Sequence, residues 1–253
     1  MEMVLLTALG VGGATVIGAA AGFLFKKMSH RFSDITLAFA AGVMLAAAVI
    51  GLILPSLEYG EGPWSIPVAA AGIFSGALVL NLMDKAVPHL HRIAGVDQEA
   101  HPKQHDQLNK VLLFVMAIAI HNLPEGIAAG VGFGTGDTSE ALLIAAGIAL
   151  QNIPEGMVII APMLAAGMSN SRTFIIALAT GLVEVAGTLL GYFAVSVSTA
   201  ILPFALAFAG GTMLYVISDE MIPETHAHGS ERGATYALLT GFVVMLAMSH
   251  WLG

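Results

Sequence analysis

Cysteine is absent from this chain of 253 residues, which excludes disulfides, thiolate metal sites and cysteine nucleophiles. Charged residues are scarce as well: they make up 10% of the chain, against roughly 25% in soluble domains. That scarcity excludes an ordinary cytosolic enzyme. The nine lysines and arginines form no basic patch interleaved with aromatic residues, so the sequence predicts no nucleic-acid partner.

Long apolar runs take the place of the missing charge. Hydrophobic residues make up 57% of the chain, and they form stretches close to the ~20 residues that span a bilayer. Continuous apolar runs favour helices, which satisfy their own backbone in lipid. The sequence therefore predicts an all-α integral membrane protein, a bundle of eight transmembrane helices at residues 3–25, 35–57, 66–87, 111–133, 141–165, 173–197, 201–217 and 234–252.

The basic residues predict how these spans cross the membrane. All nine lysines and arginines lie in or beside alternate connections, and both ends of the chain lack them. The positive-inside rule therefore places those connections in the cytoplasm and both termini outside. The longest of them, residues 88–109, is polar and histidine-bearing, and is predicted to be a cytoplasmic loop. The outer connections carry acids that either form a solvated rim or concentrate cations at an entrance: Glu58, Glu61, Asp137 and Glu140.

The most informative motif occurs twice. His121-Asn-Leu-Pro-Glu-Gly126 is followed thirty residues later by Gln151-Asn-Ile-Pro-Glu-Gly156, and both copies lie inside apolar stretches. A charged group at mid-membrane depth costs roughly 2.5–3.5 kcal/mol on insertion scales. Because the chain carries that cost twice in one pattern, the motif is predicted to hold a cation.

Helical geometry gathers the donor groups of each copy. Its first residue and its glutamate are four apart and share a face, with the asparagine beside it. Pro124 and Pro154 lack an N–H, so each leaves a carbonyl free and is predicted to kink its helix and make room for an ion.

A third buried acid, Glu184, lies in the span 173–197 near Gly187 and Gly191, which are spaced to let a neighbouring helix approach. Three carboxylates permit one or two divalent ions, and the mixed donor set suits Zn²⁺, Fe²⁺ or Mn²⁺. The candidate metal ligands are His121, Asn122, Glu125, Gln151, Asn152, Glu155 and Glu184.

Polar clusters end two other spans on the predicted cytoplasmic side. Each such residue suits either an ion pathway or a helix end that faces headgroups and water, and Glu220 and Glu224 are favoured as exit-side ligands. The candidate pathway residues are Asp84, His89, Asp219, Glu220, Glu224 and His226. Met44, within the span 35–57, is either a packing residue or a soft ligand.

On these residues the chain resembles the ZIP (Zrt/Irt-like protein) divalent-metal transporters, in particular the GufA-like prokaryotic branch. The resemblance rests on the HNxPEG motif, its second copy and Glu184, and it covers the whole chain, implying one domain over residues 1–253. It implies a binuclear centre in which one ion is held by His121, Glu125, Gln151 and Glu155. Asn122, Asn152 and Glu184 would form the second subsite, with Glu125 and Glu155 bridging.

The resemblance also implies a homodimer and a movement in which one helix bundle slides against another. It places Met44 on the entrance side, and Asp84, His89, Glu220 and Glu224 along the route to the cytoplasm. Two departures bear on the ions held. Gln151 replaces a histidine common in eukaryotic members, and Asn152 stands where some relatives have aspartate, so the second subsite loses one charge.

The resulting hypothesis is a cell-membrane carrier, with no catalytic residue, that moves divalent ions into the cytoplasm. Zn²⁺ is the expected substrate and bound ion, with Cd²⁺, Fe²⁺ or Mn²⁺ as substitutes. The alternative is an intramembrane metalloenzyme in which metal-bound water attacks a substrate. The zincin pattern HExxH is missing, and polar clusters at one mouth fit a pathway better.

Overall fold

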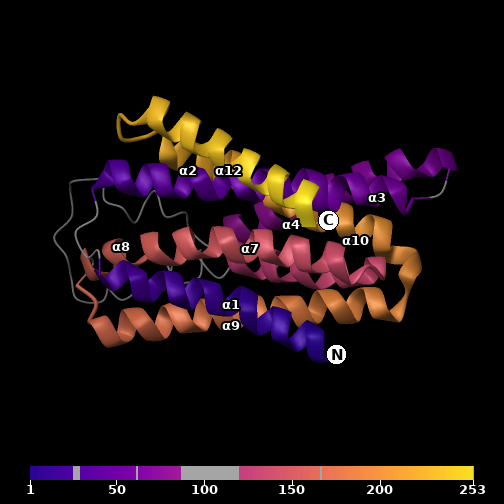
Figure 1. Cartoon of the computed structure of the whole chain (residues 1–253), viewed down its shortest axis with the longest axis horizontal. Coiled ribbons are helices and arrows are strands. Elements are labelled where there is room, and N and C mark those ends of the chain that lie inside the picture. The colour runs from indigo at the N-terminus through magenta and orange to yellow at the C-terminus, as the bar shows by residue number, and fades with distance from the viewer. Residues whose placement is uncertain (25–28, 61, 87–119, 166, 253) are drawn as a thin grey trace.

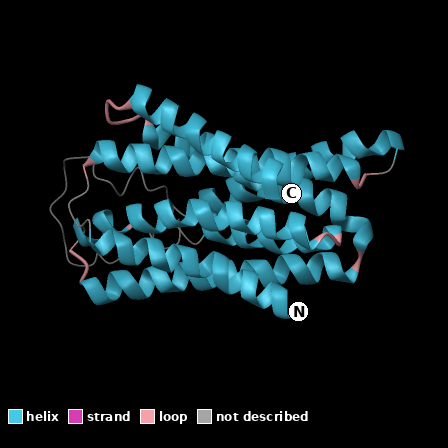
Figure 2. Cartoon of the chain, viewed as in Figure 1, coloured by secondary structure: helices cyan, strands magenta, loops and turns pink. Residues whose placement is uncertain are grey.

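The computed structural model describes residues 1–24, 29–60, 62–86, 120–165 and 167–252, and within these ranges it contains helices and no strand (Figure 2). Seven candidate membrane spans lie in the described part: Glu2–Leu24, His30–Glu58, Gly62–Met83, Thr138–Ala165, Asn170–Val197, Thr199–Thr225 and Glu231–Leu252. They match seven of the eight predicted stretches. The remaining one, predicted at 111–133, is described from residue 120 onward and is helical over 120–132.

The helices succeed one another along the described ranges. In chain order they are α1 (Glu2–Leu24), α2 (His30–Ala46), the π-helix η1 (Ala47–Ile53), α3 (Leu54–Glu58), the 3₁₀-helix η2 (Gly62–Trp64), α4 (Ser65–Ala86), the helix 120–132, the 3₁₀-helix η3 (Phe133–Thr135), α7 (Thr138–Val158), α8 (Ile160–Ala165), α9 (Asn170–Val197), the 3₁₀-helix η4 (Thr199–Ile201), α10 (Leu202–Val216), the π-helix η5 (Ile217–Met221), α11 (Ile222–Thr225) and α12 (Glu231–Leu252).

Side chains of short polar residues fix where three of the long helices begin. Ser29 accepts a hydrogen bond from the backbone of Phe32 at the start of α2, and Ser169 accepts one from Arg172 at the start of α9. Asp137 accepts from Ser139 and Glu140 at the start of α7. Such caps satisfy the first free N–H groups of a helix, so they set the register of the α7 and α9 side chains that line the site.

The helices form two groups that pack mainly within themselves. The first bundle consists of α1, the helix 120–132, α7, α8 and α9, with α1 lying against both α7 and α9. The second bundle consists of α2 with η1 and α3, α4, α10 with η5 and α11, and α12; here α2 packs on α12, and α4 packs on α10. Figure 1 shows the second bundle in the upper part of the view and the first in the lower part. They meet where α7 runs beside α2 and η1.

Both described chain ends lie toward the same end of the bundle, on the right in Figure 1. This arrangement agrees with termini on one side of a membrane. The location of both termini outside the cell stays a prediction from the basic residues.

Glycines bring the helices of the first bundle into backbone contact. A β-carbon on Gly18 would meet the backbone of Ile153, and one on Gly187 would lie 2.6 Å from the carbonyl oxygen of Leu123. One on Gly191 would likewise meet the carbonyl of Ile127. The prediction that Gly187 and Gly191 let a helix approach Glu184 is confirmed: that helix is 120–132. Without a hydrophobic driving force in lipid, such close approach stabilises the bundle by dispersion and polar contacts.

Two π-helical turns precede prolines in the second bundle. The N–H of Leu54 bonds the carbonyl of Val49, and that of Ile222 bonds Ile217, each five residues back. Pro55 and Pro223 follow directly, and a proline deprives the carbonyl four residues earlier of its partner. A widened turn re-pairs the neighbouring groups, as is common at functional sites. These turns were not predicted from the sequence. In contrast, α7 runs through Pro154 as one helix to Val158, and the kink at Pro154 stays a prediction.

Replacing Gly18 by alanine is expected to destabilise the first bundle. The new methyl group would collide with the backbone of Ile153, which cannot move aside as a side chain can, and overpacking of this kind costs about 1–3 kcal/mol. Thermal unfolding of the purified protein in detergent measures the loss. Gly10→Ala in the same helix is the matched control, since a β-carbon at Gly10 would contact nothing within 4 Å. Equal melting temperatures for the two variants would contradict this packing.

Candidate metal centre

The doubled motif and Glu184 come together inside the first bundle. The helix 120–132 supplies Glu125, α7 supplies Gln151, and α9 supplies Glu184, with exposed fractions of 1%, 0% and 0%. Glu125 lies within electrostatic range of both Glu155 and Glu184. The structure therefore gathers the three predicted acids in one buried region, which the sequence alone placed on three separate helices.

Four of these side chains make up the first cluster: His121, Glu125, Gln151 and Glu155. The amide nitrogen of Gln151 donates to Oε1 of Glu125 at 2.8 Å. His121 is close enough to Glu155 to interact with its charge. The members thus come from both motif copies and lie near one another.

The remaining predicted ligands form a separate network, the Glu184 cluster. Asn152 donates its amide nitrogen to Oε2 of Glu184 at 2.7 Å, and Asn122 donates to Oε1. Thr15 of α1 donates its hydroxyl to the same Oε1 at 2.6 Å. In this cluster the neutral side chains hydrogen-bond the carboxylate, and both asparagines present nitrogen to it.

Several buried oxygens at the centre have no hydrogen-bond partner within the described part of the chain. They are Oε2 of Glu125, Oε1 of Gln151, Oε1 of Glu155 and Oδ1 of Asn152. A buried polar atom without a partner costs about 1–3 kcal/mol, and more when charged. All four atoms are acceptors, so a cation would satisfy them directly. Oxygen and imidazole donors in this combination fit Zn²⁺ and its neighbours.

His121 also joins the two bundles. Its Nε2 lies 2.8 Å from Oε1 of Glu220 in η5, and both side chains are about one-fifth exposed, at 20% and 22%. Among the described residues no three His, Asp or Glu side chains converge as metal ligands. An ion in the first cluster would compete with Glu220 for His121.

The other predicted pathway residues lie in different environments. Asp219 and Glu224 are exposed near the same end of the second bundle. His226 is engaged locally, with Nδ1 2.9 Å from the carbonyl of Ile222 and Nε2 3.2 Å from the hydroxyl of Thr235, so the structure does not bring it to the cluster. Asp84 lies in α4 but its side chain is not described, and His89 lies outside the described residues.

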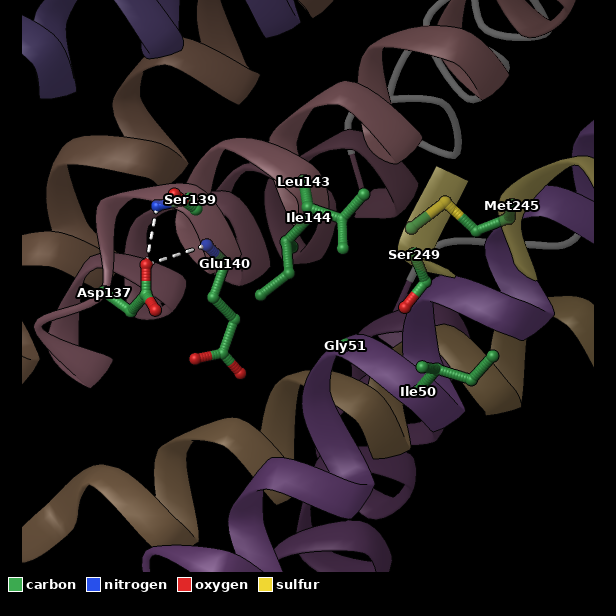
Figure 3. A pocket seen from close by; sticks show the side chains of 9 residues that line it. All are labelled: Ile50, Gly51, Asp137, Ser139, Glu140, Leu143, Ile144, Met245 and Ser249. Carbon is green, nitrogen blue, oxygen red and sulfur yellow. Dashed lines mark hydrogen bonds between the residues drawn. The ribbon is translucent and has the colours of Figure 1, made fainter. Parts of the chain in front are cut away.

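A pocket of about 190 Å³ opens between the bundles on the opposite side of the cluster from Glu220. Figure 3 shows the Glu140 carboxylate reaching into it from α7, opposite Gly51 of η1. Asp137 and Ser249 add polar groups, while Ile144 forms part of the apolar wall. Two of the four acids predicted for the outer connections, Asp137 and Glu140, thus line a cavity between the two bundles.

The contact between η1 and α7 places Met44 relative to the cluster. A β-carbon on Gly51 would lie 3.0 Å from Cγ1 of Ile144, and one on Gly147 would lie 3.6 Å from Cβ of Ala47. The two helices run antiparallel, so these pairs put Met44 level with Gln151. Met44 is 1% exposed, and the cluster begins about 10 Å along α7 from Ile144, at 1.5 Å per residue.

Sequence reasoning missed Thr15 and the pairing of His121 with Glu220. Threonine is unremarkable in an apolar helix because its hydroxyl often bonds its own backbone. Only the packing of α1 against α7 and α9 reveals that Thr15 faces Glu184. The second contact links residues 99 positions apart, and no local pattern encodes it.

Known proteins align with nearly all of this chain. A family described as ZIP Zinc transporter matches residues 94–249. The chain is 40% identical over 254 residues to the zinc transporter GufA of Myxococcus xanthus, covering 98% of each. It is 38% identical over 245 residues to the zinc transporter ZIPB of Bordetella bronchiseptica, covering 95% of this chain and 78% of that one. Human zinc transporter ZIP11 is 32% identical, with 95% and 94% covered. The chain belongs to the ZIP zinc transporter family.

Proposed function

We propose that this protein carries divalent transition-metal cations, chiefly Zn²⁺, through the membrane by way of the first cluster. One observation carries the proposal: buried oxygens of Glu125, Gln151 and Glu155 lack hydrogen-bond partners within an apolar helix bundle. With the imidazole of His121, they would supply four donors, the number that Zn²⁺ prefers. Cd²⁺, Fe²⁺ and Mn²⁺ are the expected substitutes.

Transport is favoured over the metalloenzyme alternative. An enzyme would need an open coordination position for water and a channel for its substrate, whereas here polar groups lie on both sides of the cluster along the line between the bundles. The relatives are named as zinc transporters. Membership of a transporter family and this two-sided arrangement support the same proposal.

The proposed route runs along the boundary of the two bundles. A cation enters the pocket lined by Asp137 and Glu140, passes the level of Met44 and reaches the first cluster. His121 then shares it with Glu220, and the exposed Asp219 and Glu224 pass it to water. Asp84 and His89 belong to this exit by resemblance alone. A membrane potential of 100 mV, negative inside, contributes about 4.6 kcal/mol for a divalent ion, so inward movement is downhill.

The separation into two bundles supports a movement in which one bundle slides against the other in a cell membrane. Contacts within each bundle are close backbone contacts through glycine, while the boundary holds the pocket and the pair formed by His121 and Glu220. The ligands lie in the first bundle, which would therefore carry the ion. A homodimer, with both termini outside, remains part of the proposal through the resemblance.

Replacing Glu125 by glutamine is expected to abolish zinc uptake while the protein stays folded. Glutamine keeps the shape of the side chain but removes the negative charge that offsets the ion. Uptake of radioactive zinc into proteoliposomes, with an imposed inside-negative potential, measures the effect. Glu231→Gln, at an exposed position of α12, is the matched control and keeps wild-type uptake. Undiminished uptake by Glu125→Gln would exclude the first cluster as the carrier site.

A disulfide between the bundles is expected to stop transport reversibly. The chain has no cysteine of its own, so Ala47→Cys with Gly147→Cys introduces a single pair. The 3.6 Å between the β-carbons suits a disulfide. Uptake should vanish on oxidation and return on reduction. The control pair Gly132→Cys and Ala141→Cys, whose β-carbons would be 3.9 Å apart within the first bundle, leaves uptake active when oxidised. Transport that survives the first cross-link would rule out sliding.

Replacing Glu220 by alanine is expected to tighten zinc binding and slow transport. The alanine removes the carboxylate that competes for His121, and a hydrogen bond to a charged group is worth about tenfold in affinity or more. The released ion also loses its next ligand. Zinc titration in detergent gives the dissociation constant, and proteoliposome uptake gives the rate. A variant in which both quantities stay unchanged would remove Glu220 from the route.

A further inference from the structure

The Glu184 carboxylate is nearly saturated by hydrogen bonds. It accepts from Thr15 and Asn122 on Oε1, and from Asn152 on Oε2. A carboxylate offers about four lone-pair positions, so one remains, on Oε2. Because an amide binds metal ions through its oxygen, Asn122 and Asn152 are both turned the wrong way for an ion beside Glu184. The open positions there are that lone pair and Oδ1 of Asn152.

The first cluster, by contrast, keeps several buried oxygens free of hydrogen bonds. Its glutamates and Gln151 each keep one buried oxygen without a partner. The hydrogen bond from Gln151 to Glu125 occupies the amide nitrogen and leaves the amide oxygen open. The open acceptors of the centre are therefore concentrated on one side of it.

Thr15 is held in place by the motif itself. A β-carbon on Gly156 would meet the carbonyl oxygen of Thr15, and one on Gly126 would meet that of Glu184. The final glycine of each motif copy thus lets one of the two hydrogen-bonding partners approach. A side chain at position 156 would push Thr15 away from α7, and one at position 126 would push Glu184 away from the helix 120–132.

We propose that Thr15 is a positioning residue that, with Asn122 and Asn152, keeps Glu184 hydrogen-bonded, so that the centre takes one divalent cation, in the first cluster. This inference rests on the proposed function and specifies the number of ions carried. Glu184 then lies beside the ion as a hydrogen-bonded side chain and not as a ligand. The second subsite implied by the resemblance is replaced in this chain by a hydrogen-bond network.

The test counts zinc ions bound to the full-length protein in detergent, by equilibrium dialysis against Zn²⁺ alone. Wild type is expected to bind one ion per chain. Asn152→Asp restores an anionic oxygen and is expected to bind two. Adding Thr15→Val removes the competing hydroxyl and tightens the second ion by about tenfold or more, the factor for one hydrogen bond to a carboxylate. Adding Thr15→Ser instead retains a hydroxyl and returns the affinity to that of Asn152→Asp alone.

Two ions on the wild-type chain would overturn the inference and leave the proposed function standing. A second ion whose affinity is the same with threonine and valine at position 15 would overturn the role of Thr15. The wild-type count decides the stoichiometry even where a variant fails to fold. Glu125→Gln separates the two proposals: it should bind no ion, and a wild type that also binds none would contradict both.

Discussion

The need of buried carboxylates for positive charge is the constraint on which the rest of this structure depends. Glu125 and Glu184 are removed from water inside an apolar bundle, where an uncompensated charge costs several kcal/mol. The structure meets that need in two ways. Glu184 is surrounded by neutral donors, and Glu125 and Glu155 keep open oxygens beside Gln151 and His121. The first arrangement satisfies the Glu184 oxygens within the protein, while the second leaves acceptor oxygens that a cation would satisfy.

The helix packing serves this division. The glycine that ends each motif copy admits a neighbouring backbone, at Thr15 for one copy and at Glu184 for the other. Those contacts keep α1, α7, α9 and the helix 120–132 together as one body. By contrast, the boundary with the second bundle has a pocket at one end and the hydrogen bond between His121 and Glu220 farther along. Rigid packing around the proposed ligands, with fewer close contacts across the boundary, would be the physical basis for the proposed movement of the ion with its bundle.

Much of this could be predicted from the sequence, because hydrophobic length and helical spacing are local properties. Seven spans and the grouping of the doubled motif follow from them, and the two glycines beside Glu184 were correctly interpreted as a contact face. The partners of each group could not be predicted. Whether Asn152 offers an oxygen to an ion or a nitrogen to Glu184 depends on how the helix that bears Thr15 packs beside α7 and α9. Likewise, the pairing of His121 with Glu220 depends on how two bundles dock, and the π-turns before Pro55 and Pro223 depend on backbone pairing.

X-ray absorption spectroscopy of the zinc-loaded protein tests the central claim most directly. The account predicts one zinc ion with a single imidazole and oxygen ligands, at about 2.0–2.2 Å, and no neighbouring metal. The imidazole signal should disappear in His121→Ala. A zinc ion surrounded by water alone, or by ligands that persist in Glu125→Gln, would contradict the claim that the open oxygens of the first cluster hold the transported cation.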